Sequence, residues 1–342
     1  MMVHLAAALV GTGPALCFTP LARADVPRSI AVVVATSGSS GGSKEVGISA
    51  KALLASARAT NEFLGAKIGE VWSLILPLTH VAGINVLTRS LELGTTPIDL
   101  RTTDQYPKAD FTAIVPTQLF RALHGDDHLL AHLQHCRAVL VGGAALSESV
   151  LQMANDAGIN VVTTYGMTET CGGCVYNGTP ISGVEIDTRD GSIRIKSPTI
   201  ASTYLNDEDA WKHALADGWF VTNDIGTLVD GKLTVAGRAD DVIISGGEKI
   251  SLRAIERALQ EKFTENEFAA FSIPDVEWGN ALHIAIAGDH SASTQKISAY
   301  LEESFGVVAK PKGFLILSTL PMIGVGKVDQ KALAQALLER KA

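Results

Sequence analysis

Strand-like and helix-like patterns alternate through the middle of this chain, and this alternation limits its fold more than any other feature. Short apolar runs typical of buried strands occupy residues 71–78, 111–115, 138–141 and 161–164. Between them lie stretches of helical length and pattern, at 81–93, 117–123 and 148–157. Parallel strands need a crossover, normally a helix, so this order predicts a mainly parallel sheet with helices on its faces. Ligands of such sheets bind at the carboxyl ends of the strands.

The pattern changes at about residue 184, where we expect short strands at 184–186, 192–196, 218–221, 225–229 and 232–235, separated by glycine and aspartate turns such as Asp230-Gly231. After about residue 237 we expect a compact α+β tail with helices at 252–262, 294–305 and 331–340, and strands at 269–273, 282–287 and 313–317. We therefore predict an α/β fold in two domains. The N-terminal domain, residues 1–237, has mainly parallel sheets flanked by helices plus a small antiparallel β region; the C-terminal domain, residues 238–342, is small, mobile and α+β.

Composition and charge exclude several function classes. The formal net charge is −8, which argues against broad nucleic-acid binding because such binding needs a basic surface. No apolar run reaches the length of a membrane-spanning helix. Cys171 and Cys174 have metal or redox spacing, but no second pair accompanies them, so we interpret them as incidental. The cysteine usage suits a reducing compartment, and we predict a cytoplasmic protein.

The N-terminal residues combine an apolar run at 5–10 with Gly11-Thr12-Gly13-Pro14, which ends that run early. The first residues carry no lysine or arginine, unlike the start of a secretory signal. We interpret this segment as a short structured lead-in, with a secretory signal as the weaker alternative.

A loop rich in glycine and hydroxyl residues follows the apolar run 30–34, with the sequence Ala35-Thr36-Ser37-Gly38-Ser39-Ser40-Gly41-Gly42-Ser43-Lys44. Glycines allow a tight backbone whose N–H groups point at one anion, and the hydroxyls and the lysine add further donors. The spacing differs from the Walker loop, because Lys44 lies between Ser43 and Glu45. By itself the segment fits a phosphate-binding loop and a flexible linker equally well.

Two further segments follow strands of the predicted parallel sheet. The small residues of Gly142-Gly143-Ala144-Ala145 let a flat ligand approach the backbone, although a turn that caps the next helix explains them as well. In Tyr165-Gly166-Met167-Thr168-Glu169-Thr170 the ring could stack on a purine, a hydroxyl could bind phosphate and the carboxylate could hold Mg²⁺. A loop with an unrelated glutamate is the alternative. We expect Thr168 and Glu169 at the same sheet edge as the glycine-rich loop.

Later segments carry charged or glycine residues suited to ligand binding. Asp224 could accept hydrogen bonds from ribose hydroxyls, and Arg238 could reach ribose or phosphate. Asp240 lies between two zones of different composition and is a hinge candidate. The turn Gly246-Gly247 could approach a second ligand. Lys327 lies on a glycine-flanked loop, where a lysine is normally only solvated.

Taken in order, these segments resemble the adenylate-forming superfamily of acyl-CoA synthetases, adenylation domains and luciferases. The resemblance runs from about Ile30 to the end and rests on six motifs, each weak alone but very specific in this order. It implies two half-reactions. A carboxylate attacks the α-phosphate of Mg·ATP to give an acyl-adenylate and pyrophosphate, and a thiol, usually that of coenzyme A, then displaces AMP. ATP, Mg²⁺ and coenzyme A are therefore expected.

The resemblance also implies roles for single residues. Lys327 would bridge the carboxylate and the α-phosphate, Glu169 would hold Mg²⁺, and Thr168 is a further catalytic candidate. The expected ATP-binding set is Thr36, Ser37, Gly38, Ser39, Ser40, Gly41, Lys44, Gly142, Gly143, Ala144, Tyr165, Gly166, Met167, Asp224 and Arg238. Asp240 would be the hinge about which the small domain rotates, bringing Gly246 and Gly247 over the thioester-forming site.

The chain departs from the family pattern at four positions. Ser43 replaces a frequent proline, Asn223 and Thr203 each replace a common glycine, and Gln330 replaces a common arginine. The phosphate loop begins at residue 36, whereas most members carry a much longer portion before it. This short start and the segments 76–90 and 114–119 resemble the short actinobacterial o-succinylbenzoate–CoA ligases of menaquinone biosynthesis.

Within segment 76–90, Thr79 and His80 are candidates for the acyl-substrate pocket, although His80 fits a packing histidine equally well. Arg89 could pair with a second carboxylate, but the sequence favours a place on the helix surface. Three other functions stay open: a ligase for another aryl or acyl acid, a stand-alone adenylation enzyme that loads a carrier protein, and a non-catalytic nucleotide-binding homologue. The oligomeric state is open between a monomer and a homodimer.

Overall fold

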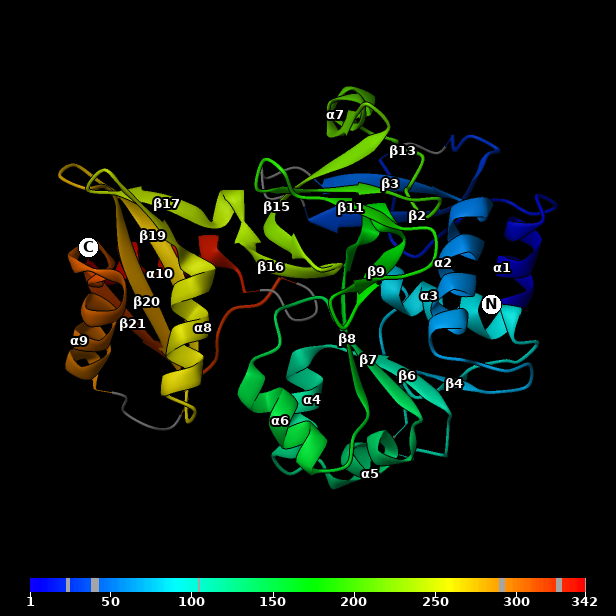
Figure 1. Ribbon diagram of the computed structural model, residues 1–342, viewed down its shortest axis with the longest axis horizontal. Helices are drawn as coiled ribbons and strands as arrows, with labels where there is room; N and C mark the ends of the chain where they lie inside the picture. The colour runs from blue at the N-terminus through cyan, green and yellow to red at the C-terminus, as the bar shows by residue number, and fades with distance from the viewer. Residues whose placement is uncertain (23–24, 38–42, 104, 289–292, 324–327, 342) are drawn as a thin grey trace. The chain divides into compact units, whose positions relative to one another are not determined.

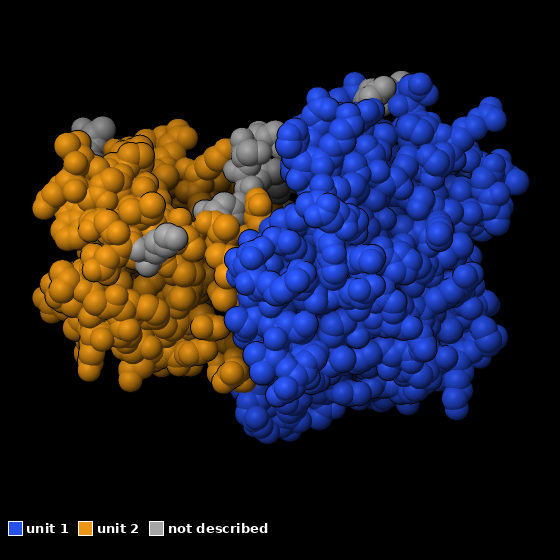
Figure 2. Space-filling model, turned by 45° about the horizontal axis from the view of Figure 1, so that its top comes forward, with its two compact units in different colours: residues 1–146, 150–222, 226–234 blue, residues 147–149, 223–225, 235–342 orange. Residues whose placement is uncertain are grey.

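The computed structural model describes residues 1–22, 25–37, 43–103, 105–288, 293–323 and 328–341, without the side chains of residues 240, 249 and 341. These residues divide into two compact units, coloured separately in Figure 2. Unit 1 comprises residues 1–146, 150–222 and 226–234, and unit 2 comprises residues 147–149, 223–225 and 235–342. The predicted boundary after residue 237 lies close to the change of unit after residue 234. No helix in the described part of the chain is long and apolar enough to cross a membrane.

The largest sheet of unit 1 has the strand order β10-β9-β8-β7-β6-β4-β5 (Figure 1). Its parallel strands are β4 Trp72–Leu74, β5 Ile98–Asp99, β6 Phe111–Ile114, β7 Ala138–Val141 and β8 Val161–Met167. Strands β9 Gly172–Tyr176 and β10 Thr179–Pro180 continue the sheet in antiparallel fashion. The predicted parallel sheet is confirmed. Strand β4 is shorter than predicted, and the chain turns at Pro77, which has no N–H to continue a ladder.

Helices cover this sheet as the alternation predicts. They are α3 Val81–Glu92, α4 Pro116–Leu123, α5 Asp127–His135 and α6 Glu148–Asp156. Leu119 of α4, Leu133 of α5 and Ala154 of α6 share one core with the sheet residues Ile114 and Val139. Helix α3 packs against β4, β6 and β9. Helix α5 is missing from the prediction.

The glycine-rich loop belongs to a second sheet, with the order β1-β2-β3-β13. Its strands are β1 Leu16–Cys17, β2 Ile30–Ser37, β3 Ser43–Ser49 and β13 Thr203–Tyr204; helix α1 Met2–Leu9 precedes it and α2 Ala50–Phe63 follows β3. Strands β2 and β3 form an antiparallel hairpin in which Thr36 lies opposite Lys44. The predicted location at the edge of the parallel sheet is therefore wrong. The prediction missed strand β3 because its start is polar, with Lys44 and a buried Glu45, and does not resemble a buried strand in sequence.

A third sheet has the order β11-β12-β15-β14, with β16 paired to β15. The strands are β11 Glu185–Asp187, β12 Ser192–Lys196, β14 Leu215–Ala216, β15 Trp219–Val229 and β16 Lys232–Arg238, and α7 Glu208–Ala214 precedes β14. The two strands predicted at 218–221 and 225–229 are one strand. The polar pair Asn223-Asp224 suggested a break, but Asp224 lies on the buried face together with Phe220 and Thr222.

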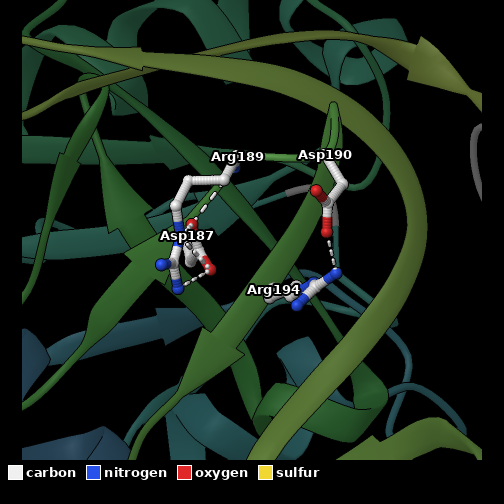
Figure 3. A network of polar contacts seen from close by, with 4 residues as sticks. All are labelled: Asp187, Arg189, Asp190 and Arg194. Carbon is white, nitrogen blue, oxygen red and sulfur yellow. Dashed lines mark hydrogen bonds and ion pairs between the residues drawn. The ribbon is translucent and has the colours of Figure 1, made fainter.

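Figure 3 shows two ion pairs at the turn between β11 and β12, Asp187 with Arg189 and Asp190 with Arg194. Hydrogen bonds from Arg189 lower the pKa of Asp187 to about 2. The Arg189 side chain is 82% exposed, so water screens this pair and we assign it little stabilising effect.

Unit 2 contains a sheet with the order β18-β17-β20-β19, and β21 pairs with β20. Its elements are η2 Ala239–Asp241, β17 Val242–Ser245, β18 Glu248–Ser251, α8 Leu252–Lys262, β19 Glu267–Asp275, β20 Gly279–Ala287, α9 Thr294–Phe305, β21 Gly313–Leu317 and α10 Gln330–Lys341. Helices α8 and α9 share one core with Ala270 and Ile284. Leu333 of α10 belongs to a second core, with Ala269 and Ala285. Ala269 and Ala270 are successive residues of β19 and face opposite sides of the sheet. Helix α10 therefore covers the face opposite to the one that α8 and α9 cover.

Candidate active site

The hairpin of β2 and β3 carries the described part of the predicted phosphate loop. The Thr36 hydroxyl donates to the Lys44 carbonyl at 3.4 Å, and Ser37 lies opposite Ser43. The Lys44 ammonium lies 4.4 Å from the centre of the Tyr204 ring, a cation–π contact. The predicted residues Gly38, Ser39, Ser40 and Gly41 lie outside the described residues.

Glu169 lies in a short 3₁₀ helix, η1 Thr168–Thr170, directly after the end of β8. The Tyr204 hydroxyl donates a hydrogen bond to Glu169 Oε1 at 2.8 Å. Tyr204 is only 2% exposed, and burial together with the Glu169 carboxylate raises the pKa of its hydroxyl. The phenol therefore stays protonated and donating. Tyr204 contacts both Lys44 and Glu169, so it brings together two predicted site residues from different sheets.

Tyr204 and Asn206 are site residues that sequence reasoning missed. Asn206 accepts from the Glu45 N–H at 2.8 Å and donates to the Ser43 carbonyl at 2.6 Å. It thus fixes the chain just after the phosphate loop. The only sequence signal is Tyr204 itself. It is the tyrosine of a Gly-Tyr pair that is common in the family, and in this chain Thr203 replaces the glycine.

Close packing explains the glycines at the ends of β7 and β8. A Cβ on Gly142 would lie 2.1 Å from Thr164 Oγ1, and one on Gly166 would lie 2.0 Å from the Gly172 carbonyl oxygen. The backbone contact leaves no room for a side chain at Gly166, and at Gly142 the Thr164 side chain would have to move. Helix α6 begins at Glu148, directly after Ser147, so a turn that leads into this helix stays an alternative interpretation of the segment. The neighbouring predicted residues Ala144, Tyr165 and Met167 are half-buried.

His80 precedes α3 as its N-cap residue and is exposed, so the packing-histidine alternative is wrong. Its Nδ1 lies 3.0 Å from the Thr79 hydroxyl. Partial loss of hydration lowers the pKa of the ring, which favours neutral imidazole. The two acyl-pocket candidates therefore contact each other at the start of α3.

Helix α3 runs from His80 past the segment that follows Glu169. Asn85 Nδ2 donates to the Cys171 carbonyl at 2.6 Å, and the Ser56 hydroxyl of α2 donates to the same atom at 2.9 Å. Cys171 has a left-handed backbone with φ of 53°, a conformation that costs energy for a residue with a side chain. Two hydrogen bonds from the helices hold this turn, and with it the position of Glu169.

Arg89 lies one turn further along α3 and is 3% exposed, so its predicted place on the helix surface is wrong. Its Nη2 donates to the Tyr176 hydroxyl at 3.3 Å, and its guanidinium lies 5.0 Å from the Trp72 ring centre. Its Nε has no hydrogen-bond partner, and no carboxylate among the described residues pairs with it. Burial lowers its pKa, but an arginine stays charged. Unit 1 thus holds a buried cation that has no anionic partner in the part of the chain that the structure describes.

Asp224 and Arg238, the predicted ribose contacts, lie together in unit 2. Arg238 Nη1 lies 3.5 Å from Asp224 Oδ1, and Asp224 is 7% exposed. Asp240 lies in η2, directly after β16. Lys327, the predicted reactive lysine, lies outside the described residues, so its role stays a prediction, as does that of the hinge.

Gly246 and Gly247 form the turn between β17 and β18, with φ of 57° and 86°. A Cβ on Gly246 would lie 2.9 Å from the Trp278 ring, and the Gly246 N–H donates to the Trp278 carbonyl at 3.0 Å. Lys312 Nζ lies 3.9 Å from the centre of the same ring. Trp278 therefore lies beside the turn Gly246-Gly247, which is predicted to face coenzyme A, and Lys312 lies beside Trp278. The sequence analysis singled out neither residue.

Comparison with known proteins decides the family. Residues 9–210 match the family described as AMP-binding enzyme. This chain belongs to that family. The match covers more than half of the chain, and it confirms the adenylate-forming resemblance and the expected fold class.

Several AMP-binding enzymes are similar over most of this chain. A probable 2-succinylbenzoate–CoA ligase of Mycobacterium tuberculosis is 35% identical over 330 residues, 91% of this chain and 85% of the relative. The o-succinylbenzoate CoA synthetase of Bacillus subtilis, solved with its acyl-adenylate intermediate, has a TM-score of 0.77 at 26% identity, over 89% of this chain and 69% of that chain. The same enzyme was solved with ATP and magnesium. That structure has a TM-score of 0.76 at 25% identity, and the match covers 89% of this chain and 70% of that chain.

Proposed function

We propose that this AMP-binding enzyme is an ATP-dependent ligase that converts 2-succinylbenzoate and coenzyme A to the acyl-CoA thioester. The observation that carries the choice of acid is the buried Arg89, which has no anionic partner among the described residues. 2-Succinylbenzoate has two carboxylates, and activation of one leaves the other free. A buried guanidinium next to Tyr176 and Trp72 suits a second carboxylate on an aromatic acid. The similar ligases named above support the same substrate.

In the first half-reaction the substrate carboxylate attacks the α-phosphorus of ATP and pyrophosphate leaves. The carboxylate is already ionised, so no general base is needed. The hairpin from Thr36 to Lys44 would hold the β- and γ-phosphates. Lys327 would face the carboxylate and α-phosphate oxygens, where negative charge concentrates in the transition state.

Magnesium would bind at Glu169 as part of Mg·ATP, and it would offset charge on the triphosphate. A carboxylate is the ligand type that Mg²⁺ prefers, and the Tyr204 hydroxyl holds this one in place at 2.8 Å. Asp224 and Arg238 would bind the ribose together, because their ion pair in unit 2 holds the two side chains next to each other.

In the second half-reaction the sulfur of coenzyme A attacks the acyl carbonyl carbon, and AMP leaves with the bonding electron pair. The turn Gly246-Gly247 would lie beside the incoming thiol after rotation about Asp240. Trp278 and Lys312 add an aromatic face and a positive charge to this turn, which suits an adenine and its phosphates. Cytoplasmic location and a homodimer stay predictions.

A substrate screen with the purified chain tests the proposal. We expect pyrophosphate and AMP to form with 2-succinylbenzoate and coenzyme A, at a kcat/KM far above that for benzoate or medium-chain acids. Turnover of those acids without turnover of 2-succinylbenzoate would contradict the choice of acid. A phosphopantetheinyl carrier that replaces coenzyme A as the better acceptor would identify a carrier-loading enzyme. Absence of acyl-adenylate with every acid, in single-turnover experiments, would identify a non-catalytic homologue.

The Tyr204→Phe variant tests the link between the phosphate hairpin and Glu169. It keeps the ring below Lys44 and removes only the hydroxyl on Glu169. A hydrogen bond to a charged group contributes about 1.5–3 kcal/mol, so we expect kcat/KM for Mg·ATP to fall about 10- to 100-fold. The apparent affinity for magnesium should fall with it. The Tyr165→Phe variant is the matched control for loss of a tyrosine hydroxyl elsewhere in the site. Equal magnesium dependence of wild type and Tyr204→Phe would refute the linking role.

A further inference from the structure

The outer edge of strand β19 in unit 2 is held by side chains from two helices on opposite faces of the sheet. Among the described residues, strand β19 is the last strand in its sheet, so the backbone atoms along its outer edge have no neighbouring strand there. The Ala270 N–H donates to Glu256 Oε1 of α8 at 3.0 Å. The Ala270 carbonyl accepts from Gln330 Nε2 of α10 at 3.4 Å. Glu256 and Gln330 thus bind neighbouring polar atoms of one residue.

Each of these helices leads to a part of the predicted catalytic apparatus. Gln330 is the first residue of α10 and follows Lys327 by three positions. Glu256 lies one turn after Arg253, whose Nε lies 3.2 Å from Asp241 Oδ2. Asp241 is adjacent to the predicted hinge residue Asp240. Helix α8 therefore contacts the hinge segment through Arg253 and, one turn later, the start of α10 through Glu256 and the backbone of Ala270.

We propose that Glu256 is a positioning residue for adenylation: it ties helix α8, which also holds the hinge segment through Arg253, to the start of α10, three positions after Lys327. Its ionised carboxylate makes a charge-assisted hydrogen bond to the Ala270 N–H, which is stronger than the bond that a neutral carboxyl accepts. Protonation of this carboxyl from solvent weakens the connection. Deprotonation returns the proton to solvent and restores it. The effect on adenylation rests on the proposed function, whereas the titration of Glu256 does not.

The surroundings of Glu256 place this titration near neutral pH. Burial is the main cause that raises the pKa of this carboxyl, to about 7. Among charged groups, Arg253 lowers the pKa and Asp241 raises it. Strand β19 contributes a peptide N–H, and α10 contributes the neutral Gln330 amide on the same residue. The ionised fraction of a group with a pKa near 7 rises from about 10% at pH 6 to about 90% at pH 8.

Thermal unfolding of the full chain gives a test that does not need activity. The pKa of Glu256 is higher in the folded state than the ordinary value of 4.5, so the folded state binds more protons between these two values. Stability is therefore present below the ordinary pKa and is lost as the pH rises through about 7. We expect the Tm of wild type to fall between pH 5 and pH 8 relative to that of Glu256→Gln. Glu261→Gln, an exposed glutamate on the same helix, should follow wild type.

Adenylation rates separate a positioning role from a structural one. We expect single-turnover acyl-adenylate formation to rise by up to about ninefold from pH 6 to pH 8 in wild type, in proportion to ionised Glu256. In Glu256→Gln the rate should stay near the low-pH value within about twofold, and thioester formation from supplied acyl-adenylate should not change. Gln330→Arg places a cation at Ala270, so it should lower the pKa of Glu256 and move both the rate increase and the Tm decrease to lower pH.

The outcomes are distinguishable. Parallel pH profiles in wild type and Glu256→Gln, for both Tm and adenylation, would overturn the proposal. Equal loss of both half-reactions in Glu256→Gln would overturn it as well, because it indicates general damage. If Glu256→Gln does not fold, an unchanged pH dependence of Tm in Gln330→Arg overturns it instead. If wild type forms no acyl-adenylate with any acid, the proposed function fails, and the Tm comparison still decides whether Glu256 titrates near neutral pH.

Discussion

Lys327→Ala is expected to lower the rate of acyl-adenylate formation by about 10³-fold and to leave thioester formation from supplied acyl-adenylate nearly unchanged. Removal of one group that stabilises developing negative charge commonly costs about 10²–10³-fold in kcat, and a full positive charge at the α-phosphate lies at the upper end. In the second half-reaction, by resemblance, the small domain has rotated and this lysine no longer faces the reacting atoms. The measurement is pyrophosphate release for the first step and acyl-CoA formation from synthetic acyl-adenylate for the second.

Lys331→Ala is the matched control, since it removes an exposed lysine from the first turn of α10. It should keep both half-reactions within about twofold of wild type, as surface substitutions usually do. Equal loss of both steps in Lys327→Ala would mean that the lysine stays at one site throughout. Domain rotation would then be the wrong account of this enzyme.

Arg89→Met should lower kcat/KM for 2-succinylbenzoate strongly while it makes the protein more stable. Loss of one partner of a buried charge pair costs about 2–5 kcal/mol, which corresponds to about 30-fold to several-thousand-fold in kcat/KM. Benzoate has no second carboxylate, so its weaker turnover should change little. The ratio of the two kcat/KM values is therefore the quantity to measure.

The stability gain follows from the state of Arg89 without substrate. The guanidinium is buried, burial disfavours its charge, and no carboxylate among the described residues offsets that cost. Methionine has a similar length and no charge, so we expect the free energy of unfolding to rise by about 1–4 kcal/mol. Chemical denaturation without substrate measures this. A drop in stability would mean that the Tyr176 and Trp72 contacts outweigh the desolvation of the charge.

Arg58→Met controls for the loss of an arginine on the neighbouring helix α2. The Arg58 side chain is 66% exposed and pairs with Glu92 at 2.6 Å. Its replacement should change stability by no more than about 0.5 kcal/mol and leave the substrate ratio as in wild type. Equal effects of Arg89→Met on both acids would remove Arg89 from the acyl pocket and with it the argument for a dicarboxylic substrate.

Much of the fold follows from local sequence because each pattern carries its own physical signal. Strands β7, β12 and β21 and helices α8 and α9 have the predicted bounds, since apolar period and end signals agree there. Two of the errors occur where a polar residue lies in a buried position. Asp224 inside β15 and Glu45 inside β3 both look like interruptions, and each is buried with a partner that lies far away in sequence.

Ordered motifs are enough to predict the family, the chemistry and most of the candidate residues, because they identify residue types and their spacing. Which of these residues contact one another depends on how distant segments pack in the fold. Tyr204 joins Lys44 to Glu169 across two sheets, and neither its ring contact nor its hydrogen bond has a local sequence signal. Packing also decides the environment of Arg89 and Glu256. A charge on a helix looks the same in sequence whether it faces water or the core, and only packing against other elements removes the water that determines its energy.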